Sequence, residues 1–200
     1  MSLIQLTTLK ARLGLADADV RDDDFLTAAI AAVTSRFDRE CNRSFARSAA
    51  ATFDFPADEL NLVVKHYPIE EVTSFSLKTS EADGFVVQNG IDFLINETRS
   101  IIALSSPLGT ARQLGRVTFA GGYVLPGATA EAGQTALPAD LVQAAGEQVA
   151  YWFQNRDRLG LSSMSGQGGG MVKDRVSVVA PFDLLPIVMN TLKKYERWVN

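Results

Sequence analysis

Apolar residues recur along this chain with two different periods, and the period changes twice. Steps of three or four residues, typical of one helix face, run through the first 42 residues and return after residue 138. Between about 50 and 123 the apolar residues alternate with polar ones, as they do in strands. Helices, then strands, then helices indicate an α+β fold rather than a wound parallel sheet. We predict a helical, mostly α domain with a small antiparallel β-sheet or hairpin insertion between its N-terminal and C-terminal helices.

Four helices are predicted from such stripes. They cover about 8–13, 23–42, 138–156 and 183–198. The second has the clearest stripe: Leu26, Ile30, Val33, Phe37 and Cys41 step by four, three, four and four residues. Gly14 suits a left-handed stop after the first helix, and Pro186 is compatible with the last helix only in its first turn.

Turn signals divide the β region every 8–15 residues, which is typical of a compact antiparallel sheet or sandwich. Asn89-Gly90 is the strongest hairpin signal, because this pair readily adopts the positive φ angles of a type I′ turn. Pro68 marks a bend before a further strand, and a last short strand is expected at 175–180. The chain is thus predicted to consist of a core domain (1–158), a flexible Gly/Ser loop (159–172) and a C-terminal arm of strand and helix (173–200).

The loop contains five of the 15 glycines of the chain, within "GLSSMSGQGGGMVKDR", residues 160–175. A Walker phosphate loop requires G-x-x-x-x-G-K-[ST], but here Lys173 follows Val172 and precedes Asp174. The run also follows a predicted helix, whereas a phosphate cradle opens one. We therefore predict mobile chain rather than a nucleotide site. The candidate residues for assembly or docking in this loop are Gly166, Gly168, Gly169, Gly170 and Lys173.

Composition narrows the classes of function. The 200 residues are 46% hydrophobic and 21% charged, with a net charge of −4 and a pI of about 5.0. This balance is unlike that of domains that grip nucleic-acid backbones, which are usually basic. One cysteine and one histidine allow neither a disulfide within the chain nor a Cys/His zinc site. We predict no metal, no cofactor, no membrane segment and no signal peptide.

No catalytic constellation emerges from the titratable residues. His66 lies near Glu70 and Glu71, but no nucleophile motif accompanies them, so a half-exposed loop histidine is the preferred interpretation. Cys41 belongs to an apolar stripe, which predicts a buried thiol. Five aspartates in "DADVRDDD", residues 17–24, lack the glycine and glutamate of an EF-hand loop and indicate a charged helix start. An enzyme with a site around His66 is a minor alternative.

Large aromatic residues gather towards the ends of two predicted helices. Trp152, Tyr195 and Trp198 are the candidates for contacts with another subunit or with a partner. Burial in the core is the alternative interpretation of these side chains.

Four stretches follow one another in an order that resembles a known family. They are "LTTLKARLGL" with "DDDFLTAAIAAVTSRFDRECNRSF", then "HYPIEEVTSFSL", then "GIDFLINETRSIIAL", and finally "GRVTFAGGYVLP" with "LPADLVQAAGEQVAYWFQNRD". Their order and spacing, over about 1–158, resemble the head–tail connector (adaptor) proteins of tailed bacteriophages. That family shows an Asp-rich turn before an Ala/Ile-rich helix, a proline before a valine-rich strand, a short hairpin, and an aromatic–x–Gly–Tyr strand end before a proline-led helix. The sequence after 158 departs from the pattern.

The resemblance implies a structural virion protein and not an enzyme. Such proteins form a ring of roughly a dozen subunits under the portal, extend the DNA channel and provide the attachment platform for neck or tail proteins. The implied partners are further copies of the chain, the portal protein and a downstream neck or tail protein, while DNA passes without sequence-specific binding. The implied location is the neck of the virion, after assembly in the bacterial host cytoplasm. Another neck component, a head-closure or tail-completion protein, is the alternative, and the long helices weigh against it.

Overall fold

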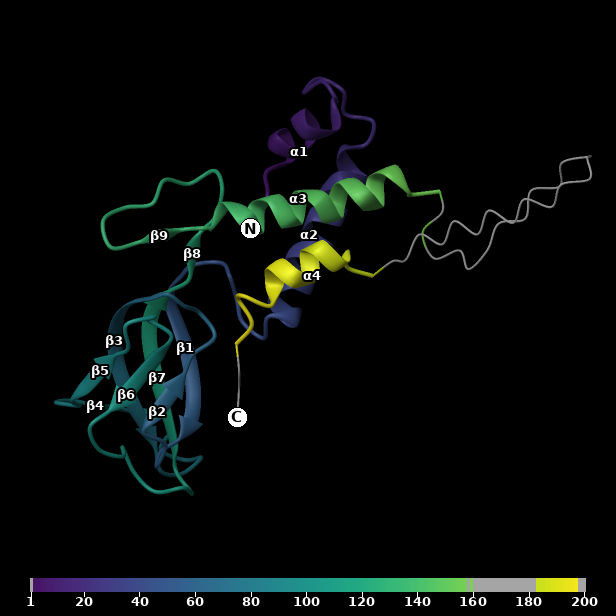
Figure 1. Cartoon of the computed structure of the whole chain (residues 1–200). Helices are drawn as coiled ribbons and strands as arrows, with labels where there is room; N and C mark the ends of the chain where they lie inside the picture. Colours follow the sequence, from purple (N-terminus) through teal and green to yellow (C-terminus); the bar gives the residue numbers. More distant parts are fainter. Residues whose placement is uncertain (1, 158, 160–182, 198–200) are drawn as a thin grey trace, which may run out of the picture.

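The computed structural model describes residues 2–157, 159 and 183–197, which form two bodies lying side by side (Figure 1). Four helices make up one of them, called here the helical body. Seven strands make up the other, the β body. Each has its own cluster of buried apolar side chains. The chain begins in the helical body, crosses to the β body after α2 and returns after β7.

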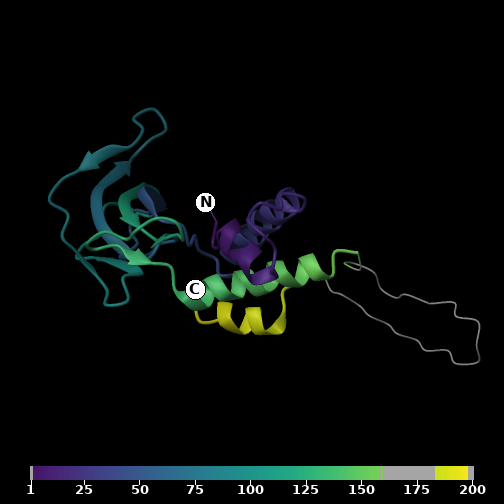
Figure 2. The same cartoon turned by 90° about the horizontal axis from the view of Figure 1, so that it is seen from above.

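The helical body consists of α1 (Leu6–Leu13), α2 (Asp23–Glu40), α3 (Ala139–Gln154) and α4 (Pro186–Leu192). In Figure 2, α4 lies along one side of α3, with α1 and α2 on the other. The first three helices begin and end within two residues of the helices that the apolar stripes predicted. All five stripe residues of α2 and the C-cap, from Leu26 to Cys41, are buried, as the stripe predicted. Gly14 ends α1 with a φ of 70°, in the left-handed region.

The last helix is shorter than the expected span of 183–198. It begins at Pro186 and ends at Leu192, after which the backbone N–H of Tyr195 donates to the carbonyl of Leu192 at 2.8 Å. The Tyr195 ring packs edge-on against Phe45, and its hydroxyl donates to Asp140. These tertiary contacts favour a turn over continued helix, and apolar periodicity carries no information about them.

Two antiparallel sheets make up the β body. Their strands are β1 (Ser48–Pro56), β2 (Asn61–Val63), β3 (Ile69–Lys78), β4 (Val86–Gln88), β5 (Phe93–Ile95), β6 (Ile101–Leu104) and β7 (Leu114–Gly121). One sheet has the order β1-β7-β3-β4 and the other β2-β6-β5. Every second residue of β7 is buried, so the strand packs one face against the core. There Val117 and Phe119 join Phe55, Ile69 and Ile102.

Asn89-Gly90 does not form the predicted hairpin. The strand before it, β4, pairs with β3, and the strand after it, β5, pairs with β6, so the segment crosses from one sheet to the other. Gly90 does have a positive φ of 72°. The residue pair therefore specifies a turn, whereas strand pairing is decided by the faces that each strand buries. The hairpin expected within "GIDFLINETRSIIAL" is present, because β5 and β6 pair antiparallel.

The prediction of a mostly helical domain is wrong, although the α+β class is right in part. Helices and strands take up about equal shares of the described chain. The β region is not a small insertion, since its two sheets enclose a hydrophobic core of their own. Its strands look short in the sequence, but β1 and β3 extend to 9 and 10 residues once β7 pairs between them.

A glycine pair brings the chain back from the β body to the helical body. Gly121 ends β7, and Gly122 precedes the short parallel pair of β8 (Tyr123–Val124) and β9 (Thr135–Ala136). Gly122 has a φ of 104°, and a Cβ there would lie 2.7 Å from the carbonyl oxygen of Ala46. Only glycine combines this conformation with so close a backbone approach.

Replacing Gly122 with alanine is expected to lower the free energy of unfolding by about 2–4 kcal/mol, because it adds backbone strain and a backbone clash. Urea denaturation followed by circular dichroism measures the loss. Gly133→Ala is the matched control: its φ is also positive, at 85°, but nothing lies within 4 Å of the added Cβ. It should cost only about 1 kcal/mol, and equal losses in the two variants would contradict the role of the close approach.

Candidate functional site

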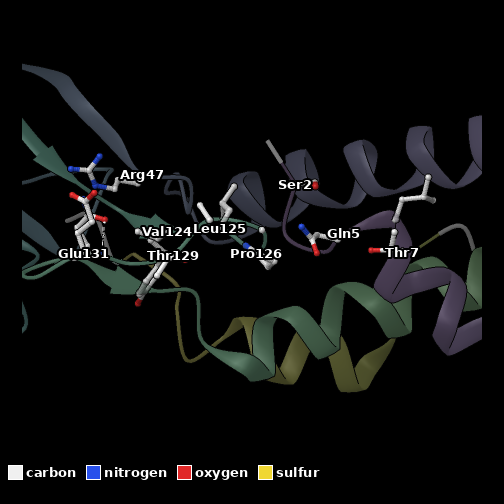
Figure 3. Close-up of a pocket in the computed structure, with 14 residues that line it drawn as sticks. Ser2, Gln5, Thr7, Arg47, Val124, Leu125, Pro126, Thr129 and Glu131 are labelled. Carbon is white, nitrogen blue, oxygen red and sulfur yellow. Dashed lines mark hydrogen bonds between the residues drawn. The ribbon is translucent and has the colours of Figure 1, made fainter. Parts of the chain in front are cut away.

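An open groove of about 830 Å³ runs beside the junction of the two bodies (Figure 3). Ser2, Gln5 and Thr7, from the start of the chain and α1, line one end. The opposite wall is β8 and the loop that follows it, as far as Glu131. Arg47 lies beside Glu131 at the far end of the groove in Figure 3.

One cation in the lining of the groove is tightly paired. The guanidinium of Arg47 donates to both carboxylate oxygens of Glu70, with Nη2–Oε2 at 2.8 Å and Nε–Oε1 at 2.9 Å. This bidentate pairing raises the pKa of Arg47 and offsets its charge. The lining also offers hydroxyl groups and the carboxylate of Glu131, and it contains no histidine, cysteine or lysine.

The structure does not bring His66, Glu70 and Glu71 together as a catalytic group. Burial lowers the pKa of His66, and the positive charges of Arg43 and Lys65 lower it further. A carboxylate partner would raise this pKa instead. The carboxylate of Glu70 is engaged by Arg47. His66 is half-buried, in agreement with the interpretation of a loop histidine without a partner base.

The remaining sequence candidates for chemistry are accounted for by packing. Cys41 is fully buried, and burial raises the pKa of its thiol to about 12, so the reactive thiolate is disfavoured. Among the described residues, no group of three or more His, Cys, Asp or Glu side chains is placed to hold a metal ion. In the same part of the chain, none of the helices has both the length and the apolar character needed to cross a membrane.

The predicted contact residues have different environments. Trp152 is only 4% exposed and packs in the core of the helical body. Tyr195 is half-buried and packs against the same core. Trp198 lies outside the described residues, as do the predicted strand at 175–180 and the loop candidates Gly166, Gly168, Gly169, Gly170 and Lys173. Their role in assembly stays a prediction.

Sequence reasoning missed the cluster that joins the two bodies. Arg43 is 4% exposed, and its guanidinium carbon lies 3.3 Å from the ring centroid of Tyr67, 4.8 Å from that of Phe45 and 5.2 Å from that of Tyr123. Its Nη2 also donates to the carbonyl oxygen of Tyr67. We call these four residues the aromatic junction. Its one signal in the sequence is an arginine two positions before an aromatic residue, Phe45.

The C-terminal part of the described chain reinforces this junction. The backbone N–H of Arg197 donates to the carbonyl of Cys41 at 2.9 Å, and its guanidinium donates to the carbonyl of Val63 in β2. The Tyr67 hydroxyl donates to the carbonyl of Tyr195 at 3.2 Å. The segment after α4 therefore contacts both bodies at once.

Exposed apolar side chains gather on two strand edges. β4 and β5 each form one edge of their sheet (Figure 1). Val86 and Val87 are 54% and 57% exposed, and Leu94 is 75% exposed. Sheet edges with open backbone groups and apolar side chains favour contact with another chain, so these strands are a candidate subunit contact.

Comparison with known proteins shows where a similar fold occurs. Neither a protein-family model nor a curated protein matches the sequence. A chain in the neck of an empty GTA (gene transfer agent) particle, computed with C6 symmetry, matches with a TM-score of 0.60 at 15% identity, over 99% of this chain and 91% of that one. A chain in the neck of a native GTA particle, computed with C12 symmetry, matches with a TM-score of 0.50 at 17% identity and the same coverages. The fold is therefore one found in the neck of a phage-like particle.

Replacing Arg43 with lysine is expected to lower the free energy of unfolding by about 1–2 kcal/mol, because lysine keeps the charge but loses the plane that stacks on Tyr67. Urea denaturation measures the change. Arg39→Lys, at an exposed position near the end of α2, is the control and should change stability by less than about 0.5 kcal/mol. Full stability in Arg43→Lys would show that stacking contributes little.

Two half-buried tyrosines, Tyr67 and Tyr195, predict a loss of stability at alkaline pH. Burial raises the pKa of Tyr67, and burial together with the hydrogen bond to Asp140 raises that of Tyr195. In the unfolded chain both ionise near pH ~10. Their contribution is thus fully present below that pH and is lost as the pH rises towards the folded pKa values. Urea denaturation between neutral and alkaline pH should show this decline, and Tyr195→Phe should make it less steep. If the free energy of unfolding of Tyr195→Phe falls with pH as steeply as that of the wild type, Tyr195 does not contribute to the decline.

Proposed function

We propose that this chain is a structural protein in the neck of a phage-like particle and that it acts there as a head–tail connector (adaptor). In this role, copies of the chain form a ring of roughly a dozen subunits under the portal. The ring extends the DNA channel and presents the platform to which the next neck or tail protein attaches. DNA passes through it without sequence-specific binding.

One observation carries the proposal: the fold matches a neck chain over 99% of this chain and 91% of that one. The likeness therefore extends to the whole subunit and is not limited to one shared module. The two GTA necks were computed with C6 and C12 symmetry. Cyclic symmetry arises when one surface of a subunit binds a different surface of the next copy until the ring closes. These matches support a homo-oligomeric ring.

The surface and charge of the chain are compatible with this role. A net charge of −4 disfavours tight binding to the DNA that passes through a channel. The groove beside the junction and the apolar edges of β4 and β5 offer surfaces for protein contacts.

A second neck role is favoured by one observation. Head-closure and tail-completion proteins are expected to be richer in strands than connectors, and here strands and helices take up about equal shares. The two roles differ in the partner that they bind. A connector binds the portal directly, whereas a head-closure protein binds the assembly beneath it.

The full chain is expected to form rings that light scattering and negative-stain images detect, either alone at high concentration or after addition of a purified portal. Binding to the portal alone supports the connector, because no other neck protein is then present. Binding only to a portal that already carries a connector supports the head-closure role. A chain that stays monomeric at every concentration and binds neither assembly would overturn the proposal.

A further inference from the structure

A pocket of about 380 Å³ lies where α2 ends and is lined mainly by polar and basic side chains. Three of its lining residues, Arg39, Arg43 and Lys65, are cations, and Asp38 is its one acid. Arg39 and Lys65 are exposed, whereas Arg43 is almost completely buried as part of the aromatic junction. We call this feature the basic pocket.

Within the described part of the chain, the positive charge of the basic pocket exceeds its negative charge. Among the described residues, no salt bridge joins Arg39, Arg43 or Lys65 to an acid. The carboxylate of Asp38 already accepts the backbone N–H of Phe45 at 3.0 Å. The pocket thus has an excess of positive charge, and an incoming carboxylate that reaches the exposed Arg39 and Lys65 offsets it.

The opposite end of α2 has the complementary charge. The helix has 18 residues and is therefore about 27 Å long. At its start, Asp19, Asp22 and Asp23 are paired with Arg21, Arg156 and Lys10.

Two further aspartates at this end, Asp17 and Asp24, are exposed, and no salt bridge in the described part of the chain engages them. One helix therefore separates uncompensated negative and positive charge across the subunit.

We propose that the basic pocket of one copy receives Asp17 and Asp24 of a neighbouring copy. This inference rests on the proposed function, because a ring requires two different surfaces of one subunit to bind each other. Every copy has both halves of the contact, on opposite ends of α2. The arrangement is head-to-tail, and each subunit of a closed ring uses both halves once.

A second copy fits the basic pocket better than DNA does. Affinity for a duplex comes from neutralising several phosphates along a basic surface. Here the three cations are confined to one small pocket that also contains Asp38, and the whole chain is acidic. A pocket of this size accommodates one or two carboxylates.

Charge reversal tests the contact. One variant reverses the pocket (Arg39→Glu with Lys65→Glu) and the other reverses the turn (Asp17→Lys with Asp24→Lys). Each alone places like charges together, so its self-association should weaken by about tenfold or more. An equal mixture of the two should assemble again, because every contact in an alternating ring then joins opposite charges. Mass by light scattering and negative-stain images measure both results.

Matched controls separate this contact from general effects of charge and folding. Arg112→Glu reverses an exposed arginine outside the basic pocket and should assemble like the wild type. A zero-length carbodiimide crosslink in the wild-type chain does not depend on whether any variant folds. Crosslinking mixed 14N- and 15N-labelled chains should join Lys65 of one copy to Asp17 or Asp24 of another.

The outcomes distinguish this inference from the proposed function. The contact is overturned if the wild type forms rings but the reversed variants also assemble normally, or if the mixture of the two variants does not recover assembly. Either result leaves the proposed ring intact. The contact is also overturned, in favour of a phosphate site, if the pocket variant loses binding to a short DNA duplex while its assembly is unchanged. A wild-type chain that never associates, with itself or on a portal, overturns both.

Discussion

A buried guanidinium fixes the relative placement of the two bodies. Arg43 follows the end of α2, Tyr67 precedes β3 and Tyr123 begins β8, so three distant parts of the chain contact one cation. Burying a charge is costly unless its surroundings replace the lost water. Here the aromatic faces and the carbonyl of Tyr67 do so. These groups come from both bodies. If the helical body and the β body moved apart, the charge of Arg43 would lose this compensation.

The backbone is closely packed around the aromatic junction. Gly122 lets the chain pass within contact distance of Ala46, and Arg197 ties the end of the described chain to Cys41 and Val63. A ring closes only if each subunit presents its two contact surfaces at a fixed angle. In the proposed ring, the contacts of the aromatic junction hold the two bodies of a subunit at one such angle.

The sequence predicts what depends on neighbouring residues and misses what depends on distant ones. The stripe of α2 identified its buried face, because helical periodicity is local. Asn89-Gly90 identified a turn but not the strands that pair beside it, since β4 and β5 bind partners elsewhere in the chain. Arg43 lies just after the predicted helix at 23–42, and the sequence gives no sign that it is buried. Its burial depends on Tyr67 and Tyr123, which only the folded chain brings near.

The arrangement of charge is more informative than its sum. A net charge of −4 weakly disfavours binding to DNA and identifies no partner. Within the described part of the chain, three aspartates at the start of α2 are paired with an arginine or lysine, whereas Asp17 and Asp24 there, and the cations of the basic pocket at the other end, have no salt-bridge partner. These ends are about 27 Å apart, whereas charges are screened over about 8 Å at physiological ionic strength. The two ends therefore do not cancel each other, and each acts on whatever lies against it. An acidic chain can in this way repel DNA as a whole and still attract its own copies at defined places.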